Sequence, residues 1–121
     1  MRSKVAGGAL HSDIQLICFE INPFALFDAV QEVWVATSGM GLEALFAGRR
    51  VRCFGAPFYA GWGLTEDAVP IPRRYRKRSL EDLFHAFYLR FSRYVDPRTG
   101  RRCELEDLLD ALRAARAMAH R

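Results

Sequence analysis

The sequence lacks any long apolar run. A membrane-spanning helix needs about 20 consecutive apolar residues, and no stretch of this 121-residue chain reaches that length. The first eight residues include basic side chains but no apolar core, so no secretory signal is expected there. These absences predict a globular protein without membrane-spanning helices.

Cysteine and histidine are scarce and scattered. The six residues are Cys18, Cys53, Cys103, His11, His85 and His120. Zinc sites and disulfide frameworks both need these residues at close or repeated spacings, and no CxxC pair occurs. We therefore expect reduced thiols, as in a cytoplasmic protein, and ordinary surface or packing histidines. Neither a metal site nor a hydrolase triad is expected.

The positive charge lies mainly in the second half of the chain, which has a net charge of +4 overall. Two groups carry the excess: Arg73, Arg74, Arg76, Lys77 and Arg78, then Arg90, Arg93, Arg98, Arg101 and Arg102. Such a distribution favours an anionic partner, namely a nucleotide, a phospholipid head group or nucleic acid. No helix-turn-helix, RNP or zinc-finger pattern is present, which argues against nucleic acid.

Strands and helices are expected to alternate in the first half of the chain. Apolar and β-forming runs predict strands at 14–19, 32–36 and 51–54. Between them, Asn22 and Pro23 open one short helix, and a second runs over 39–46 and ends at Gly48. This alternation predicts an α/β fold with a parallel sheet and right-handed crossovers.

The second half is expected to be loop followed by helices. Residues 66–78 are rich in proline and arginine and predict a loop. Ser79 then caps a helix that runs to about Tyr94, with an apolar side of Leu80, Leu83, Phe84, Phe87, Tyr88 and Phe91. Residues 96–100 predict a turn, and 104–119 an amphipathic helix with Leu105, Leu108, Leu109 and Leu112 as its stripe.

The first candidate site is the segment from Thr37 to Gly41, between a strand end and a helix start. Ligands of parallel sheets bind beyond the carboxyl ends of the strands. Free amides at a helix start, together with the hydroxyls of Thr37 and Ser38, suit phosphate, and Glu43 could accept hydrogen bonds from ribose. The alternative is a structural helix start with Ser38 as its cap and Glu43 in solvent.

Two further segments are candidates for binding. The stretch 54–65 combines glycines with Phe58, Tyr59 and Trp62, whose rings could stack on a base or a sugar. Alternatively, this loop covers the open end of the sheet. The cluster at 73–78 could bind phosphate or face lipid, or it could be a solvated basic loop.

Four motifs in this order resemble the Kps/Lip-type (KpsC-like) capsule polysaccharide biosynthesis family. They are T-S-G-M-G-L-E-A-L, C-F-G-A-P-F-Y-A-G-W-G-L-T, Y-R-K-R-S-L-E-D-L and R-Y-V-D-P-R-T-G-R-R-C. The resemblance covers about residues 14–116, and its most specific part is 57–65. It implies a cytoplasmic glycosyltransferase, peripheral on the inner membrane, with Rossmann-like domains of the GT-B type. Such enzymes transfer 3-deoxy-manno-octulosonic acid (Kdo) from CMP-Kdo to a lysophospholipid-linked acceptor during capsule assembly and export.

The resemblance also implies roles for individual residues. Thr37, Ser38, Gly39 and Gly41 would hold the donor phosphate, and Glu43 would lie near the ribose or cytidine. Phe58, Tyr59, Gly61 and Trp62 would form the cleft wall, and Arg73, Arg74 and Arg76 would meet an anionic acceptor or lipid. No cofactor and no metal are expected.

The domain organisation follows from the same resemblance. Residues 1–13 are expected to be a lead-in, and 14–121 a partial Rossmann-like sugar-nucleotide-binding domain with a C-terminal helical extension. The family's His-Pro element and acidic catalytic region are expected in an upstream glycosyltransferase domain, since His11 is followed by Ser12. The chain alone is therefore expected to be incomplete and inactive, with its catalytic residues unknown. The alternative is a non-catalytic module that uses its basic face to bind anionic lipid or a partner chain.

Overall fold

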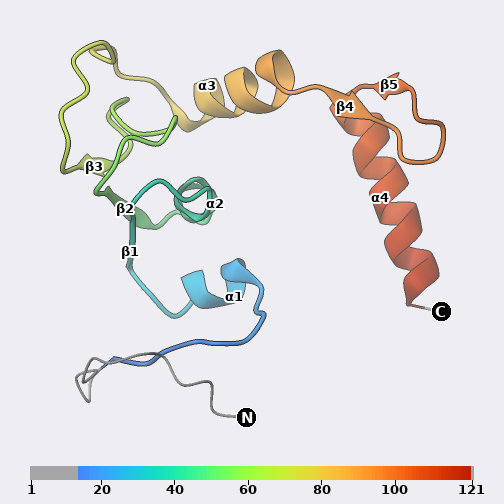
Figure 1. Ribbon diagram of the computed structural model, residues 1–121, viewed down its shortest axis with the longest axis horizontal. Helices are drawn as coiled ribbons and strands as arrows, with labels where there is room; N and C mark the ends of the chain where they lie inside the picture. Colours follow the sequence, from blue (N-terminus) through green and yellow to red (C-terminus); the bar gives the residue numbers. More distant parts are fainter. Residues whose placement is uncertain (1–13, 121) are drawn as a thin grey trace.

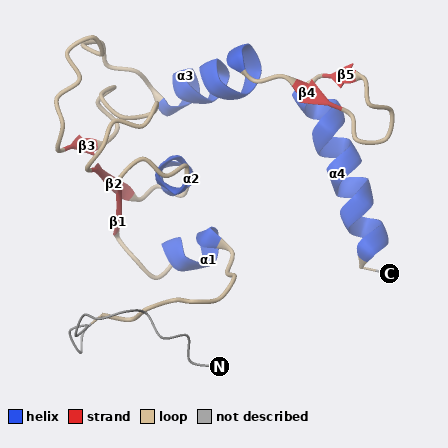
Figure 2. Cartoon of the chain, viewed as in Figure 1, coloured by secondary structure: helices blue, strands red, loops and turns tan. Residues whose placement is uncertain are grey.

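A small parallel sheet followed by a series of helices makes up the fold. The computed structural model describes residues 14–120. Its first part contains α1 (Pro23–Phe27), β1 (Glu32–Val35), α2 (Met40–Phe46), β2 (Arg50–Cys53) and β3 (Glu66–Asp67). Its second part contains α3 (Leu80–Phe84), the π-helical segment η1 (His85–Phe91), β4 (Tyr94–Val95), β5 (Arg102–Cys103) and α4 (Leu105–Ala119). Figures 1 and 2 show this order.

The β1–α2–β2 unit confirms the predicted parallel α/β arrangement. The strands pair in parallel, with Val33 opposite Val51 and Val35 opposite Cys53. Helix α2 packs on both strands, and Gly48 follows it with a φ of +73°, the left-handed conformation that ends many helices. Asn22 also caps α1 as expected, because its side chain accepts a hydrogen bond from the Phe24 amide at 3.1 Å.

The predicted strand at 14–19 is wrong. This segment has no regular secondary structure, and its large apolar side chains are exposed; Phe19 is 69% exposed. Within residues 14–120 the sheet has the order β1-β2-β3, so no strand pairs with 14–19. An apolar run becomes a strand only where it pairs with another strand and packs against other residues, and 14–19 does neither in the described part of the chain.

The predicted loop at 66–78 contains a short strand. Glu66 and Asp67 pair in parallel with Arg52 and Cys53 of β2, and the Ala68 amide continues this pairing by donating to the Cys53 carbonyl at 2.9 Å. Two residues are too few to give a periodic signal, so the sequence pattern could not reveal them. This strand determines where the preceding aromatic loop returns to the sheet.

The helix after Ser79 begins as predicted and changes its pitch. Ser79 and Asp82 form a reciprocal capping box at its start. From His85 the turns widen into η1, which ends at Phe91 rather than near Tyr94. An α-helix has fewer than four residues per turn and a π-helix has more than four. Residues spaced by four therefore stay on one side where the two are combined, and this places Leu83, Phe87 and Phe91 along the same side of the helix.

The last part of the chain forms an arm that extends away from the sheet (Figure 1). Strands β4 and β5 form a hairpin around the predicted turn, where the buried Asp96 carboxylate accepts hydrogen bonds from the Arg98 amide and guanidinium. These bonds hold the pKa of Asp96 below its usual value. Helix α4 follows as predicted, but Leu109 and Leu112 of its stripe are 42% and 51% exposed.

Candidate functional site

The two candidate segments meet where β1 and β2 end. The Phe54 amide donates to the Val35 carbonyl at 2.8 Å, and the Gly55 amide donates to the Ala36 carbonyl at 3.1 Å. A Cβ atom at Gly55 would lie 2.8 Å from the Thr37 methyl carbon and 2.9 Å from the Ala36 oxygen. Gly55 therefore allows the aromatic loop to lie directly against the turn that begins at Thr37.

The turn from Thr37 to Gly39 is exposed and offers several hydrogen-bond donors. The amides of Ser38 and Gly39 donate to no partner among residues 14–120. The Ser38 hydroxyl oxygen accepts from the Met40 amide at 3.2 Å, which leaves its proton free to donate. The N-cap of α2 is Gly39, and it makes no side-chain cap bond. The available donors thus precede the helix rather than lie in its first turn.

Tyr59 is a core residue and does not line a cleft, which corrects the sequence prediction. Its side chain is 0% exposed, and its hydroxyl donates to the Ser38 carbonyl. A Cβ at Gly41 would lie 2.2 Å from the Tyr59 hydroxyl oxygen, so Gly41 makes room for this ring. Burial raises the pKa of the Tyr59 hydroxyl to about 12, which keeps it protonated and able to donate. Tyr59 therefore supports the turn from the core side.

Glu43 lies on α2 and is half-buried. Burial raises the pKa of the Tyr88 hydroxyl on η1, and the negative charge of Glu43 raises it further. The Glu43 carboxylate has no hydrogen-bond or ion-pair partner among the described residues. Both of its oxygens therefore remain available to a ligand.

The aromatic loop is held in one conformation by Asp67, a residue that the sequence patterns did not single out. One carboxylate oxygen of Asp67 accepts from the Gly61 amide at 2.9 Å, and the other accepts from the Thr65 hydroxyl at 2.7 Å. Gly61 and Gly63 have φ values of +81° and +85°, which side chains rarely adopt. These two glycines allow the chain to turn sharply. Gly61 also packs against the Arg74 side chain and does not face an open cleft.

Arg74 supports the same loop from the other side. One of its terminal nitrogens donates to the carbonyls of Pro57 and Ala60, at 2.6 and 2.9 Å. Its guanidinium carbon lies 5.6 Å from the centre of the Trp62 ring, and the Trp62 indole donates to the Phe58 carbonyl at 2.8 Å. Of the three arginines expected to meet an anion, Arg74 is thus occupied with loop carbonyls. Arg73 and Arg76 are exposed.

Replacing Arg74 with alanine is expected to destabilise the protein by about 2 kcal/mol. The change removes two hydrogen bonds from a charged donor. It leaves the Ala60 carbonyl without this donor, and the Pro57 carbonyl keeps only its bond from the Ala60 amide at 3.1 Å. Chemical denaturation followed by circular dichroism would measure the loss. The matched control is Arg73→Ala, because Arg73 is exposed and makes no side-chain hydrogen bond to another described residue. Equal effects of the two changes would contradict this role for Arg74.

Phe58 and Trp62 border an apolar hollow beside α3 and η1. Its volume is about 390 Å³, and its other lining residues are Arg74, Leu83, Ala86, Phe87 and Phe91. The Phe58 ring stacks on Phe87 with 4.3 Å between centroids and 14° between planes. The predicted wall residues Phe58 and Trp62 therefore face the helical part of the chain. The sequence placed Phe87 and Phe91 on a helix side but gave them no binding role.

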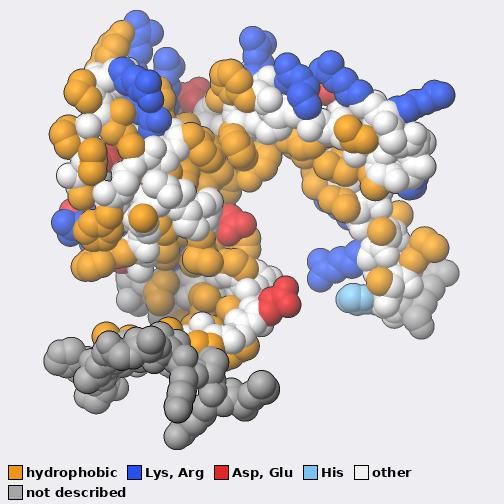
Figure 3. Space-filling view, viewed as in Figure 1, with side chains coloured by type: hydrophobic (Ala, Val, Ile, Leu, Met, Phe, Trp, Pro, Cys, Tyr) orange, Lys and Arg blue, Asp and Glu red, His pale blue; other side chains and the backbone are white. Residues whose placement is uncertain are grey.

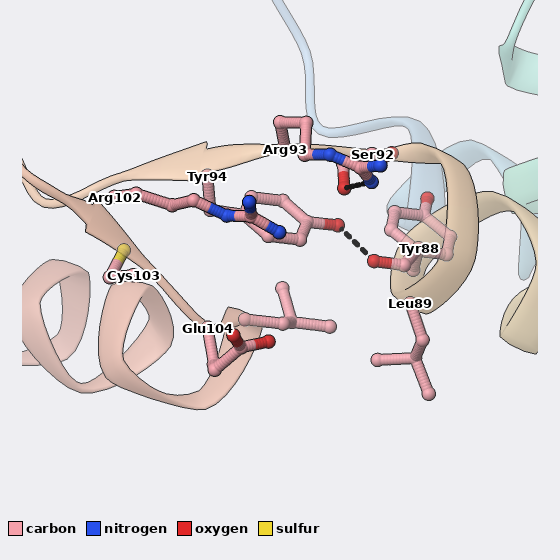
Figure 4. A pocket seen from close by; sticks show the side chains of 9 residues that line it. Tyr88, Leu89, Ser92, Arg93, Tyr94, Arg102, Cys103 and Glu104 are labelled. Atoms are coloured by element: carbon pink, nitrogen blue, oxygen red, sulfur yellow. Dashed lines mark hydrogen bonds between the residues drawn. The ribbon is translucent and has the colours of Figure 1, made fainter.

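A smaller polar hollow lies between η1 and the β4–β5 hairpin (Figure 4). It holds about 30 Å³, enough for little more than one water molecule. Beside it the Tyr94 hydroxyl donates to the Tyr88 carbonyl at 2.7 Å, as the dashed line in Figure 4 shows. This region therefore links η1 to β4. Over residues 14–120 no three histidine, cysteine, aspartate or glutamate side chains gather as metal ligands would, and no helix is long and apolar enough to cross a bilayer.

This α/β unit, with donors exposed beyond its parallel strands, belongs to a known group of proteins. The signature of the family described as "Capsule polysaccharide biosynthesis protein" matches residues 5–95, and the chain is a member of that family. It is 47% identical over 88 residues to the lipopolysaccharide-processing protein LpsZ of Rhizobium meliloti, covering 73% of this chain and 20% of LpsZ. It is 41% identical over 105 residues to the capsule polysaccharide modification protein LipA of Neisseria meningitidis, covering 82% of this chain and 15% of LipA.

Two solved structures are similar to this chain in fold over part of their length. The β-Kdo 2,4 transferase of Thermosulfurimonas dismutans KpsC is 42% identical with a TM-score of 0.81, covering 87% of this chain and 33% of that one. The β-Kdo 2,7 transferase of the same protein is 41% identical with a TM-score of 0.74, covering 79% and 33%. The chain therefore spans a fifth or less of the curated relatives and a third of the solved structures.

Proposed function

We propose that this chain is the donor-binding part of a glycosyltransferase that transfers Kdo from CMP-Kdo during capsule polysaccharide biosynthesis. The observation that carries the proposal is the exposed turn from Thr37 to Gly39. It presents the free Ser38 and Gly39 amides beside two hydroxyls, at the strand ends where parallel sheets bind ligands. Family membership and similarity to two Kdo transferases support the same chemistry.

In this proposal the donor phosphate lies against the turn. The amides of Ser38 and Gly39 and the hydroxyls of Thr37 and Ser38 would donate hydrogen bonds to its oxygens, and such bonds to a charged acceptor are stronger than neutral ones. The free carboxylate of Glu43 would accept from ribose hydroxyls. Gly41 and Tyr59 would act indirectly, because their contact fixes the Ser38 carbonyl and so the direction of the amides that follow it.

The rest of the reaction is assigned to partners outside this chain. In a GT-B arrangement a second Rossmann-like domain would supply the catalytic groups and complete the cleft. An anionic glycolipid or phospholipid at the inner membrane would act as the acceptor. On this proposal the chain binds the donor but does not transfer Kdo without that domain, so binding is the property to test.

An NMR titration with CMP tests donor binding directly. In a ¹⁵N-labelled sample, millimolar CMP is expected to shift the amide signals of Ser38 to Glu43 and to leave those of the β4–β5 hairpin in place. Ser38→Ala is expected to weaken CMP binding about tenfold, the effect of losing one hydrogen bond to a charged group. Unchanged signals from Ser38 to Glu43 at saturating CMP would refute the proposed donor site.

A further inference from the structure

Helix α4 leaves much of its apolar side exposed. The helix forms an arm that stands clear of the sheet, with hydrophobic side chains on its surface (Figure 3), and it packs mainly on the short strand β4. Leu109 and Leu112 are exposed, and Met118 is 72% exposed. Apolar surface gains stability when it is removed from water. This side of α4 therefore suits a docking partner.

The apolar stripe has the spacing of a helix that packs along another helix. Its positions are separated alternately by three and four residues: Leu105, Leu108, Leu112, Ala115 and Ala119. This spacing keeps apolar residues on one side of a helix and is typical of helices that pack in pairs. The stripe covers the whole length of α4, which has 15 residues. A second helix therefore has a contact surface along all of α4.

Side-chain size changes along the stripe. The leucines occupy its first half, and the alanines Ala115 and Ala119 occupy its end. If two such stripes pack antiparallel, the leucines of one lie opposite the alanines of the other, and large side chains fill the space that small ones leave. A parallel pair would place alanine opposite alanine and leave gaps, which close-packed interfaces avoid. The stripe therefore favours an antiparallel copy of itself.

Charge is divided along α4 in the same way. Its N-cap and first half contain only acidic charges and its second half only basic ones: Glu104, Glu106, Asp107 and Asp110, then Arg113 and Arg116, all exposed. This order suits the dipole of the helix itself. Packed helices lie about 8–10 Å apart, close to the distance over which charges act at physiological salt. Antiparallel packing therefore brings opposite charges together, whereas parallel packing brings like charges together.

The same charges argue against a membrane surface as the partner of α4. Helices that lie on anionic membranes have Lys and Arg along their polar side. The exposed acidic residues in the first half of α4 would instead be repelled by anionic lipid. A helix of complementary charge and size is the better partner, and α4 of a second copy of the chain has both properties.

We propose that two copies of this chain form a dimer through antiparallel packing of α4 against α4. The dimer has two-fold symmetry, so the same stripe serves in both copies. The contact of one pair of short helices is small, and we therefore expect a dimer that exchanges with monomer at micromolar concentrations. The proposal depends on α4 alone and not on the donor turn at Thr37, which belongs to the other part of the fold (Figure 1).

Sedimentation equilibrium of the full chain tests the dimer. The average mass is expected to rise with concentration toward twice that of one chain. Leu112→Asp is expected to raise the Kd of the dimer about tenfold or more. Leu16→Asp is the matched control and should leave the Kd unchanged, because Leu16 lies outside α4 and is 52% exposed, against 51% for Leu112. A chain that stays monomeric at millimolar concentration, or equal losses in both variants, would overturn the proposal.

Isotope-filtered NMR of the unaltered chain tests the orientation. In a sample that mixes labelled and unlabelled copies, contacts between copies are expected to join the Leu105 methyl groups of one to the Ala115 or Ala119 methyl groups of the other. Contacts between Leu105 of one copy and Leu105 of the other would indicate a parallel pair. That result, or contacts between copies that do not involve α4, would show the proposed dimer to be wrong.

Discussion

Gly41→Ala is expected to destabilise the protein by about 3 kcal/mol, the upper end of the usual cost of overpacking a core. The new methyl carbon would lie 2.2 Å from the Tyr59 hydroxyl oxygen and 2.8 Å from the ring carbon that bears it. Neither side can easily give way, because Gly41 is within α2 and Tyr59 is fully buried. Urea denaturation would measure the loss, and CMP binding should weaken along with it.

Two further variants separate this clash from a general cost of changing a glycine. Gly39→Ala should be close to neutral, since a Cβ there meets no atom within 4 Å. In a Tyr59→Phe background, Gly41→Ala should cost less, because the closest atom has been removed. The stability should recover only in part, since two carbons of the ring would still lie 2.8 and 2.9 Å from the new Cβ atom at position 41. Equal costs for Gly39→Ala and Gly41→Ala would contradict the close approach of Tyr59.

The elements predicted correctly are those with local signals. Asn22 before Pro23, Ser79 followed by Asp82, and Gly48 after an apolar helix each specify a helix end through contacts within a few residues. The β1–α2–β2 unit combines the Gly48 signal with strands that contain β-branched valines, so its parallel arrangement was also predictable. Helix caps depend little on the rest of the fold.

The errors arose where distant residues decide the outcome. The apolar run at 14–19 has the composition of a strand, but no strand of the described sheet pairs with it. The strand at Glu66 forms only because β2 is there to pair with it. Composition carries no information about which neighbours a segment will meet, and both cases depend on that information.

The candidate site was predictable in position but not in the roles of its parts. Strand order alone predicts that the turn at Thr37 and the loop at Gly55 lie together, and their contact confirms it. The burial of Tyr59 and the loop contacts of Arg74 could not be predicted, because an aromatic or an arginine beside glycines is equally typical of a binding loop. In the folded chain Tyr59 supports the turn at Ser38 and Arg74 supports the aromatic loop.

Tyr59→Ala is expected to cost about 4 kcal/mol, the usual range for removing a fully buried aromatic ring. Such a loss is a large fraction of the total stability of a small domain, roughly 5–15 kcal/mol. The cavity would open directly beneath the Ser38 carbonyl, which would lose the Tyr59 hydroxyl as a donor and keep only the Gly41 amide at 3.2 Å. Thermal and urea denaturation would measure the destabilisation, and the amide signals from Ser38 to Gly41 should broaden in the NMR spectrum of any protein that remains folded.

Phe58→Ala is the control for Tyr59→Ala, because Phe58 is the neighbouring ring and is partly exposed. Phe58 is 39% exposed, so Phe58→Ala removes less buried surface and should cost about half as much as Tyr59→Ala, leaving the signals of Ser38 to Gly41 sharp. Tyr59→Phe keeps the ring and removes one hydrogen bond, which predicts a loss of about 1 kcal/mol. If Phe58→Ala disturbed the turn as much as Tyr59→Ala, the specific support of the turn by Tyr59 would be wrong.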